Sequence, residues 1–222
     1  MNLNNKYIIL VRHGELHNLK NIVYNRDLVM KKEDIIHLSD LGRKQLSRLS
    51  KIIKRDYKVE NIFSSPETRA MESAEIIANE SEKNLKVISC KAIDEVYASG
   101  PYLTGLKMDQ WKKMNGDAYD EKLWGKFKHE KEESVIKRFT DFVIKQVKTV
   151  KTGEAVVLVS HGDPIALFIN TFLTKKIPRG VDLHKMIYPK KGQGIVFVFD
   201  SQNNYLKYFI LADQSLIQGK IY

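Results

Sequence analysis

Short strands that contain no charged residue constrain the fold of this chain most strongly. The runs YIILV at 7–11 and VVLV at 156–159 are apolar throughout instead of alternating apolar with polar residues. Such strands are typical of a sheet that helices cover on both faces. Helical patterns separate the predicted strands along the chain. The sequence therefore predicts an α/β fold, a three-layer α/β/α sandwich around a mostly parallel sheet, to which the last strands can add an antiparallel edge.

Strand and helix signals alternate along the sequence. Strands are predicted at 7–11, 61–65, 85–89, 155–160, 194–199 and 205–211. Helices are predicted at 38–55, 66–80, 132–150 and 164–173. Ser39 is expected to cap the first helix, and Pro66 and Pro164 to be the first residues of the second and fourth. The polar stretch 200–204 is expected to close a hairpin between the last two strands.

The length of 222 residues suits one domain, so we expect residues 1–222 to form a single domain. One part of it lacks a regular pattern. Residues 98–128 carry four glycines and a proline and show no continuous periodicity. We expect this stretch to be an inserted, lid-like segment that contains short helices and lines the mouth of a site.

The formal net charge of +10 raises the question of a nucleic-acid partner. The lysines, however, are scattered in pairs among acidic residues, which predicts a solvated surface and no nucleic-acid partner. The single cysteine, Cys90, excludes an internal disulfide. No stretch resembles a signal peptide or a membrane span. We expect a cytoplasmic protein that does not bind membranes, whose excess charge helps attract a small anionic substrate.

Polar side chains follow three of the predicted strands at the point where each strand ends. The first strand leads into Arg12 and His13, the second into a Ser-Ser-Pro turn followed by Arg69, and the strand at 155–160 into His161. Ligands bind at the carboxyl edge of open α/β sheets, where such strand ends meet. Two arginines, two histidines and nearby helix N-termini would suit a phosphate dianion.

Each of these features alone has a simpler explanation. A His-Gly step after a strand is commonly a turn, Ser-Ser-Pro is commonly a helix cap, and Arg69 could pair with a neighbouring carboxylate. Their joint occurrence at the same end of three strands favours a functional site.

Other chemistries lack the residues that they need. The chain has no Gly-x-Ser-x-Gly nucleophile elbow, and Cys90 has no arginine six residues on. The glycine-rich stretch 100–107 lacks the Gly-Lys-Ser/Thr ending of a P-loop. Metal binding by His13 and His161 is disfavoured because two arginines beside them would repel a cation. We expect neither a metal nor a cofactor.

Four motifs, LVRHGE, LSDLGRKQ, IFSSPETRAMESA and VVLVSHGDPIA, together resemble the histidine phosphatase superfamily, also called phosphoglycerate mutase-like, from about residue 6 to residue 211. The resemblance implies that His13 is the nucleophile, which attacks phosphorus and forms a phosphohistidine. It implies that Arg12, Arg69 and His161 bind the phosphoryl oxygens and stabilise the transferred charge. It also implies a carboxylic acid that protonates the leaving group.

The resemblance further implies that this acid lies between the second arginine motif and the second histidine motif. Here we choose Glu95, with Asp94 in reserve. Gly162 and Asn18 complete the expected substrate-binding set, although the family's asparagine would align one place later than Asn18. Leu16 stands where the family usually has Ser or Thr, and the Ser-x-Trp-Asn pattern of the mutases is missing. These departures favour a phosphatase over a mutase.

The sequence thus predicts a phosphomonoesterase that hydrolyses a small phosphorylated metabolite through a phosphohistidine. Two alternatives stay open: a phosphoglycerate mutase, and a catalytically silent protein that binds a phospho-ligand on the same fold. A protein phosphohistidine phosphatase ranks below these, because the lid-like insertion disfavours the shallow mouth that it would need. The oligomeric state is open, with a dimer as one option.

Overall fold

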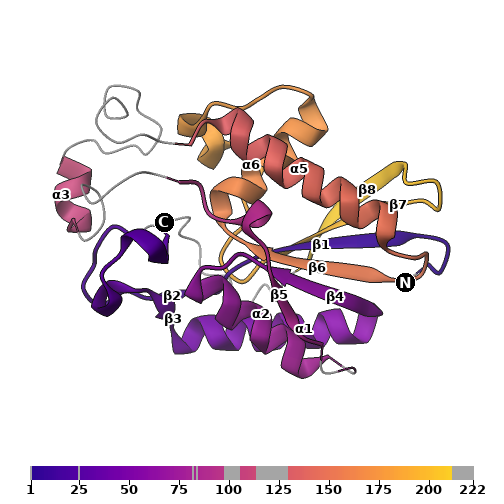
Figure 1. Ribbon diagram of the computed structural model, residues 1–222, viewed down its shortest axis with the longest axis horizontal. Coiled ribbons are helices and arrows are strands. Elements are labelled where there is room, and N and C mark those ends of the chain that lie inside the picture. The colour runs from indigo at the N-terminus through magenta and orange to yellow at the C-terminus, as the bar shows by residue number, and fades with distance from the viewer. Residues whose placement is uncertain are drawn as a thin grey trace.

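A six-stranded sheet forms the centre of the described part of the chain, in the order β5-β4-β6-β1-β7-β8 (Figure 1). The computed structural model describes residues 2–24, 26–81, 83, 85–97, 106–113 and 130–211. The strands of the sheet are β1 (Lys6–Arg12), β4 (Val59–Ser64), β5 (Val87–Ser89), β6 (Ala155–Ser160), β7 (Gly194–Phe199) and β8 (Tyr205–Leu211).

Most neighbours in the sheet run parallel. The pairs β1–β6, β4–β6 and β4–β5 are parallel, whereas β7 runs antiparallel to β1 and β8 antiparallel to β7. The last two strands form the predicted hairpin. Its turn is fixed by Asp200, whose carboxylate accepts hydrogen bonds from the backbone and the side chain of Asn204. The mostly parallel sheet with an antiparallel edge is therefore confirmed.

Helices cover both faces of the sheet, as the apolar strands predict (Figure 1). The helices α1 (Asp40–Asp56) and α2 (Thr68–Glu80) pack on one face, and α5 (Glu132–Thr149) and α6 (Gly162–Thr174) on the other. Alternate residues of β1 serve the two layers: Ile9 and Val11 pack with α1 and α2, and Ile8 and Leu10 pack with α5 and α6. The three-layer sandwich is confirmed.

The register of the central strands aligns the ends that carry the sequence motifs. Arg12 is paired with Ser160 across β1 and β6. Just beyond the strands, the N–H of His13 donates to the carbonyl of Ser160 (3.0 Å), and the N–H of Ser65 donates to the carbonyl of Val159 (2.9 Å). The three polar segments therefore meet at one carboxyl edge, as expected for ligand sites in this class of fold.

The first helix begins as the sequence predicts. The hydroxyl of Ser39 accepts a hydrogen bond from the N–H of Gly42 (3.1 Å), so Ser39 is the N-cap of α1. The ends of β4, β5 and α5 differ from the predicted ones by one or two residues, and the predicted bounds of β6, β7 and β8 are those of the structure.

The two helix starts that were assigned to prolines are wrong. Helix α2 begins at Thr68, two residues after Pro66, because its first turn is capped from another part of the chain: the N–H of Thr68 donates to Oδ2 of Asp27 (2.6 Å). Helix α6 begins at Gly162, directly after β6 and its cap residue, which makes Pro164 its third residue. A proline is tolerated there because the first N–H groups of a helix have no partner within it.

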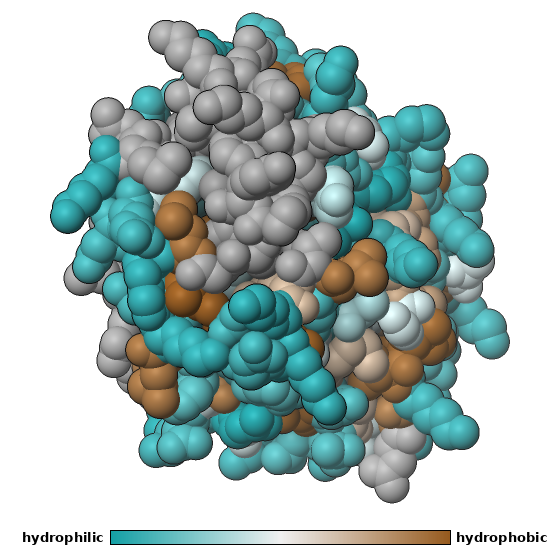
Figure 2. Space-filling view, turned by 60° about the vertical axis from the view of Figure 1, so that its left-hand side comes forward, coloured by the Kyte–Doolittle hydropathy of each residue, from teal (hydrophilic) through white to brown (hydrophobic). Residues whose placement is uncertain are grey.

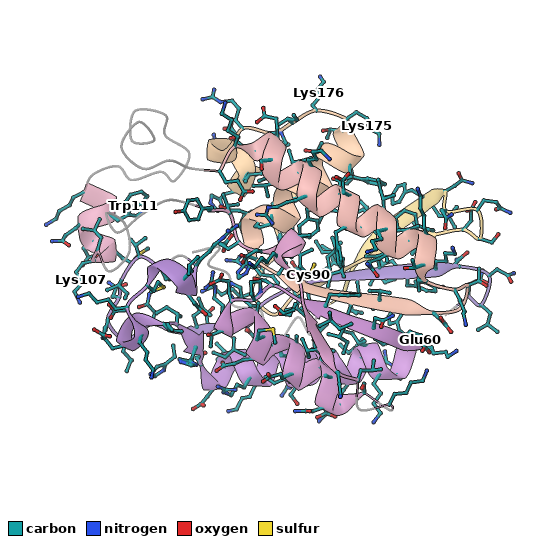
Figure 3. All side chains as sticks on the ribbon, viewed as in Figure 1. Glu60, Cys90, Lys107, Trp111, Lys175 and Lys176 are labelled. Atoms are coloured by element: carbon teal, nitrogen blue, oxygen red, sulfur yellow. The ribbon has the colours of Figure 1, made fainter. Side chains whose placement is uncertain are left out.

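The lid-like segment predicted at 98–128 lies outside the described residues except for 106–113. That part contains α3 (Met108–Lys113), a short helix of the kind expected. An isolated antiparallel bridge joins Ile22 to Lys107 beside it. In Figure 3, Lys107 and Trp111 of this segment lie at the end of the molecule opposite Glu60, which belongs to the start of β4. Residues 106–113 thus lie on the side of the carboxyl edge.

Further short elements were not predicted. A two-stranded sheet pairs β2 (Leu16–His17) with β3 (His37–Leu38), and 3-10 helices occur as η1 (Asp27–Val29), η2 (Lys32–Asp34), η3 (Lys91–Ile93) and η4 (Gly180–Lys185).

The face seen in Figure 2 is largely hydrophilic, with smaller hydrophobic patches between the polar side chains. Within the described ranges, no helix has the length and the apolar character needed to cross a membrane.

Candidate active site

His13 lies at the end of β1 and is almost completely buried. Its Nδ1 is 2.8 Å from the carbonyl oxygen of Gly14. A carbonyl can only accept a hydrogen bond, so Nδ1 carries the proton and Nε2 keeps its lone pair. Burial lowers the pKa of His13 well below its usual value, and the positive charges of Arg12 and Arg69 lower it further. The imidazole is therefore neutral, with Nε2 in the form that a nucleophile requires.

Arg12, the preceding residue, is also buried. One Nη donates to the carbonyl of Pro189 (2.9 Å), and the guanidinium carbon lies 5.1 Å from the ring centroid of Tyr188. Its buried Nε–H has no hydrogen-bond partner among the residues that the structure describes. A buried donor without a protein partner is rare and calls for an explanation. An anionic ligand at this place would supply the missing acceptor.

His161 follows β6 and is held by a chain of hydrogen bonds. The hydroxyl of Ser65 gives its one proton to Oδ1 of Asp94 (2.9 Å), so its oxygen accepts from Nε2–H of His161 (2.8 Å). Nδ1 of His161 then carries the lone pair and lies 3.3 Å from Oε2 of Glu95. The ring of His161 is 5.3 Å from that of His13, centroid to centroid. Burial lowers the pKa of His161 well below its usual value.

Arg69, in the first turn of α2, is fully buried and surrounded by carboxylates. One Nη lies 3.8 Å from Asp27 and 3.7 Å from Glu67, and the other lies 3.5 Å from Glu95. The ring centroid of Tyr24 is 5.3 Å from its guanidinium carbon. These separations are longer than a charge-assisted hydrogen bond of about 2.7–2.9 Å, so the three carboxyl groups surround the guanidinium at longer range.

Asp27 and Glu67 also bind each other's segment. The N–H of Asp27 donates to the carboxylate of Glu67, while the carboxylate of Asp27 caps Thr68. Burial raises the pKa of Glu67 to about 8, against the charge of Arg69, which opposes the rise. Two reciprocal hydrogen bonds thus tie the stretch that begins with η1 to the N-terminus of α2.

The two candidate acids differ in what their carboxyl groups face. Asp94 accepts hydrogen bonds at Oδ1 from Ser65 and from the N–H of Glu95, and its Oδ2 lies 3.3 Å from Nε of Arg26. The carboxyl of Glu95 lies within 3.5 Å of both Arg69 and His161. Burial raises the pKa of Glu95 to about 7, although the charge of Arg69 opposes this rise. Glu95 can therefore hold a proton beside Arg69 near neutral pH.

Two glycines allow the main chain to come close to its neighbours at this edge. A Cβ on Gly14 would lie 2.5 Å from Cδ2 of Leu46 and 2.7 Å from the carbonyl oxygen of Gly42. A Cβ on Gly162 would lie 2.3 Å from the hydroxyl oxygen of Tyr188. All three distances are shorter than the contacts that real Cβ atoms make. Each histidine of the cluster is thus followed by a residue that must be glycine for this packing.

The structure brings together Arg12, His13, Arg69, Glu95 and His161, and it places Gly162 next to them at the start of α6. Asn18 is arranged differently. Its side-chain amide donates to the carbonyl of Ile22 (2.8 Å) and its amide oxygen accepts from the N–H of Ile22 (3.1 Å), so both polar atoms close its own turn. A role for Asn18 in phosphate binding stays a prediction, and it would require these two bonds to open.

Sequence reasoning gave no role to several residues of the cluster. Ser65 was predicted only as part of a polar turn, although its place directly after a strand at the carboxyl edge was a usable signal. Asp27 and Glu67 carried no such signal, because no local pattern links residue 27 to the start of a helix forty residues later. Tyr188 lies between predicted elements, and no sequence pattern connects it with the cluster.

The arrangement combines a neutral imidazole with a free Nε2, two buried guanidiniums and a carboxyl group that holds a proton near pH 7. Such a set can bind a dianion, accept a phosphoryl group on nitrogen and protonate a leaving oxygen. In the described part of the chain, no group of three or more His, Cys, Asp or Glu side chains is placed so that it could hold a metal ion.

Comparison with known proteins places this chemistry in context. The sequence matches the histidine phosphatase superfamily (branch 1) over residues 8–191. It is 29% identical, over 112 residues, to phosphoglycerate mutase-like protein 4 of Arabidopsis thaliana. That match covers 50% of this chain and 45% of the Arabidopsis protein, so less than half of the relative's length is matched.

Solved structures share the fold over nearly the whole chain. One is phosphoserine phosphatase of Entamoeba histolytica in complex with 3-phosphoglyceric acid (TM-score 0.66, 21% identity, 96% of this chain and 100% of that one). Another is mycobacterial glucosyl-3-phosphoglycerate phosphatase (TM-score 0.64, 20% identity, 93% and 97%). At these identities the likeness concerns the fold.

Proposed function

The chain belongs to the histidine phosphatase superfamily (branch 1), and we propose that it hydrolyses a small phosphomonoester through a phosphohistidine on His13. One observation carries this proposal. The hydrogen bond from Nδ1 of His13 to the Gly14 carbonyl leaves a neutral Nε2 beside two buried arginines. A nucleophile and the positive charge needed to bind its target thus lie side by side.

The first half-reaction uses Nε2 of His13 to attack phosphorus. A P–N bond forms as the P–O bond to the leaving group breaks, and Glu95 gives its proton to the departing oxygen. Arg12 and Arg69 bind the non-bridging oxygens and stabilise the charge on them during transfer. His161 joins them by taking up a proton on Nδ1 when the dianion binds, because a neighbouring dianion raises the pKa of an imidazole. The leaving alcohol then departs neutral, and Glu95 is a carboxylate.

The second half-reaction releases phosphate. Glu95, now ionised, accepts a proton from a water molecule as that water attacks the phosphohistidine. The P–N bond breaks, the electron pair returns to Nε2 of His13, and inorganic phosphate is formed. Each group is then back in its starting protonation state, since the proton that Glu95 gave to the alcohol is replaced by one from water.

We place the substrate among small phosphorylated metabolites and expect no metal in the reaction. The two guanidiniums already supply the positive charge that a metal would bring to the phosphoryl group. Two proteins of similar fold are named phosphoserine phosphatase and glucosyl-3-phosphoglycerate phosphatase. These names support a small phosphorylated substrate. Gly162 lies at the N-terminus of α6, where the free N–H groups of the helix favour an anion.

A phosphoglycerate mutase is the second candidate, because the Arabidopsis relative is named phosphoglycerate mutase-like. A mutase must return the phosphoryl group from His13 to a second hydroxyl before water reaches it. Incubation with 3-phosphoglycerate, followed by analysis for the 2-phospho isomer and for free phosphate, separates the two activities. A catalytically silent binder would give neither product while still binding phosphate analogues.

The primary test measures phosphate release from p-nitrophenyl phosphate and a panel of small alkyl phosphates, with EDTA present. We expect wild-type turnover that His13→Ala abolishes, while His17→Ala, which changes an exposed histidine of β2, keeps it. Thermal unfolding of both variants shows whether each of them is folded. Release that survives His13→Ala, or that stops when EDTA is added, would contradict the proposal.

A further inference from the structure

The short stretch that carries Glu95 lies outside the hydrogen-bonding pattern of the sheet. It follows η3 (Lys91–Ile93) and continues as irregular chain through Tyr97. Backbone carbonyls in such a stretch need partners from elsewhere in the protein. The carboxyl of Glu95 must also sit within a few tenths of an ångström of its working position, since catalytic geometry tolerates little displacement.

Arg138 of α5 supplies many of these partners. Its guanidinium donates to the carbonyls of Ala92 (3.0 Å), Asp94 (2.8 Å) and Glu95 (3.1 Å). The same group donates to both carboxylate oxygens of Glu130 (2.9 and 3.0 Å). One planar side chain thus binds three backbone carbonyls and a carboxylate, a pattern that suits the fixed fork of arginine donors.

Arg26 donates to the same carbonyl of Glu95. Its Nε and one Nη donate to the carbonyl of Glu95 (3.0 and 2.6 Å), and Nε lies 3.3 Å from the carboxylate of Asp94. The Nη is also 3.4 Å from Glu130. The carbonyl of Glu95 therefore accepts from two guanidiniums that come from segments more than a hundred residues apart in sequence.

Glu130 bridges the two arginines and binds the main chain of Tyr97, two residues after Glu95. Its carboxylate accepts from the N–H of Tyr97 (3.1 Å), and its own N–H donates to the carbonyl of Tyr97 (2.6 Å). Burial alone would raise the pKa of Glu130, but the hydrogen bonds and charge of Arg138 outweigh it, and the pKa lies below its usual value. Glu130 is thus ionised at neutral pH and balances one of the two positive charges.

We propose that Arg138 and Arg26, bridged by Glu130, are positioning residues that hold the carboxyl of Glu95 against the phosphoryl site. The inference rests on the proposed function, in which Glu95 is the general acid. None of the three touches the phosphoryl group in this scheme. They act through the main chain of Glu95, so their loss should damage proton donation more than phosphate binding.

The leaving group separates positioning from general structural support. p-Nitrophenolate leaves without much help from an acid, whereas an alkoxide must be protonated as it departs. We would measure kcat/KM for Arg138→Gln on p-nitrophenyl phosphate and on the alkyl phosphate (phosphoserine, 3-phosphoglycerate or glycerol 3-phosphate) that the wild type hydrolyses fastest. We expect the alkyl reaction to fall at least about tenfold more, within the roughly 10²- to 10⁴-fold that general acids supply.

Three further variants sharpen the result. Arg55→Gln removes an arginine whose one side-chain partner among the described residues is its neighbour Asp56, and it should leave the rates on both substrates unchanged. Arg138→Lys keeps the charge but not the fork, and we expect it to resemble Arg138→Gln. Glu130→Gln keeps the size of the side chain and gives the same comparison if Arg138→Gln does not fold.

Glu95→Gln separates failure of the inference from failure of the proposed function. If Glu95→Gln lowers the two reactions equally, Glu95 is not the acid and the proposed function is wrong on this point. If it lowers the alkyl reaction selectively while Arg138→Gln and Glu130→Gln lower both equally or neither, the positioning role is refuted. Full activity of Arg138→Lys would refute the role of the guanidinium fork.

Discussion

Replacement of Glu95 by Gln should remove a specific pH dependence from the reaction. Burial raises the pKa of Glu95 to about 7, so about half of the free enzyme carries the proton at that pH. General acid catalysis needs the protonated form. The kcat/KM for an alkyl phosphate should therefore be highest below pH 7 and fall by about tenfold for each pH unit above it.

The magnitude of the effect follows from the same titration. At pH 6, Glu95→Gln should lower kcat/KM for the alkyl phosphate by roughly 10²- to 10⁴-fold, the usual contribution of a general acid. The ratio of wild type to variant should then shrink by about tenfold per unit above pH 7, because only the wild type loses its acid. The ionisation of the substrate's own phosphate is common to both enzymes and cancels in this ratio.

The assay is phosphate release from the alkyl phosphate between pH 5.5 and 9, run in parallel on three proteins. Glu60→Gln is the matched control: Glu60 pairs with Lys58 and Lys83 at the opposite end of the molecule from Lys107 and Trp111 (Figure 3). It should keep the wild-type profile. A ratio of wild type to Glu95→Gln that does not change with pH would refute the assignment, as would a wild-type rate that rises above pH 7.

Three other substitutions test the packing around the cluster. Gly162→Ala puts a Cβ 2.3 Å from the hydroxyl oxygen of Tyr188, so we expect about 1–3 kcal/mol less stability and weaker vanadate binding, measured by thermal unfolding and titration. Unchanged values would show that this contact is not tight. Ser65→Ala leaves Nε2–H of His161 without its acceptor, and should cost about 1–3 kcal/mol in urea unfolding together with a loss of kcat; a stable, fully active variant would contradict the hydrogen-bond chain. Phe168→Ala, deep in the layer of α5 and α6, should cost about 3–5 kcal/mol with KM unchanged in the folded fraction, and a loss below about 1 kcal/mol would argue against close packing there.

Much of the fold could be predicted because the central strands are apolar along their whole length. The runs at 7–11 and 156–159 have no polar face, so helices had to cover both sides. Once the strands were parallel, their polar ends had to meet, and Arg12, His13 and His161 did not need to be close in sequence. The arrangement of the cluster was therefore available from pattern and topology together.

The rest depended on contacts that no local pattern encodes. The start of α2 moved to Thr68 because the carboxylate of Asp27 caps it, and that pairing joins two segments far apart in sequence. Arg138 was visible only as a basic residue beside the apolar stripe of a helix. Its contacts with the backbone of Ala92 and Glu95 require the packing of α5 against η3. Long-range capping and clamping of irregular chain are decided by tertiary structure.

The charges of the site explain how substrate binding would prepare the acid. In the structure, Arg69 faces carboxyl groups at 3.5 to 3.8 Å, one of which is that of Glu95. A phosphate dianion that binds Arg69 more closely would take over that positive charge. Glu95 would then keep its burial and gain a neighbouring negative charge, and both raise the pKa of a carboxyl group. The substrate itself would thus hold the proton on Glu95 until the leaving oxygen takes it, and the departure of the alcohol would leave Glu95 ionised for its second role with water.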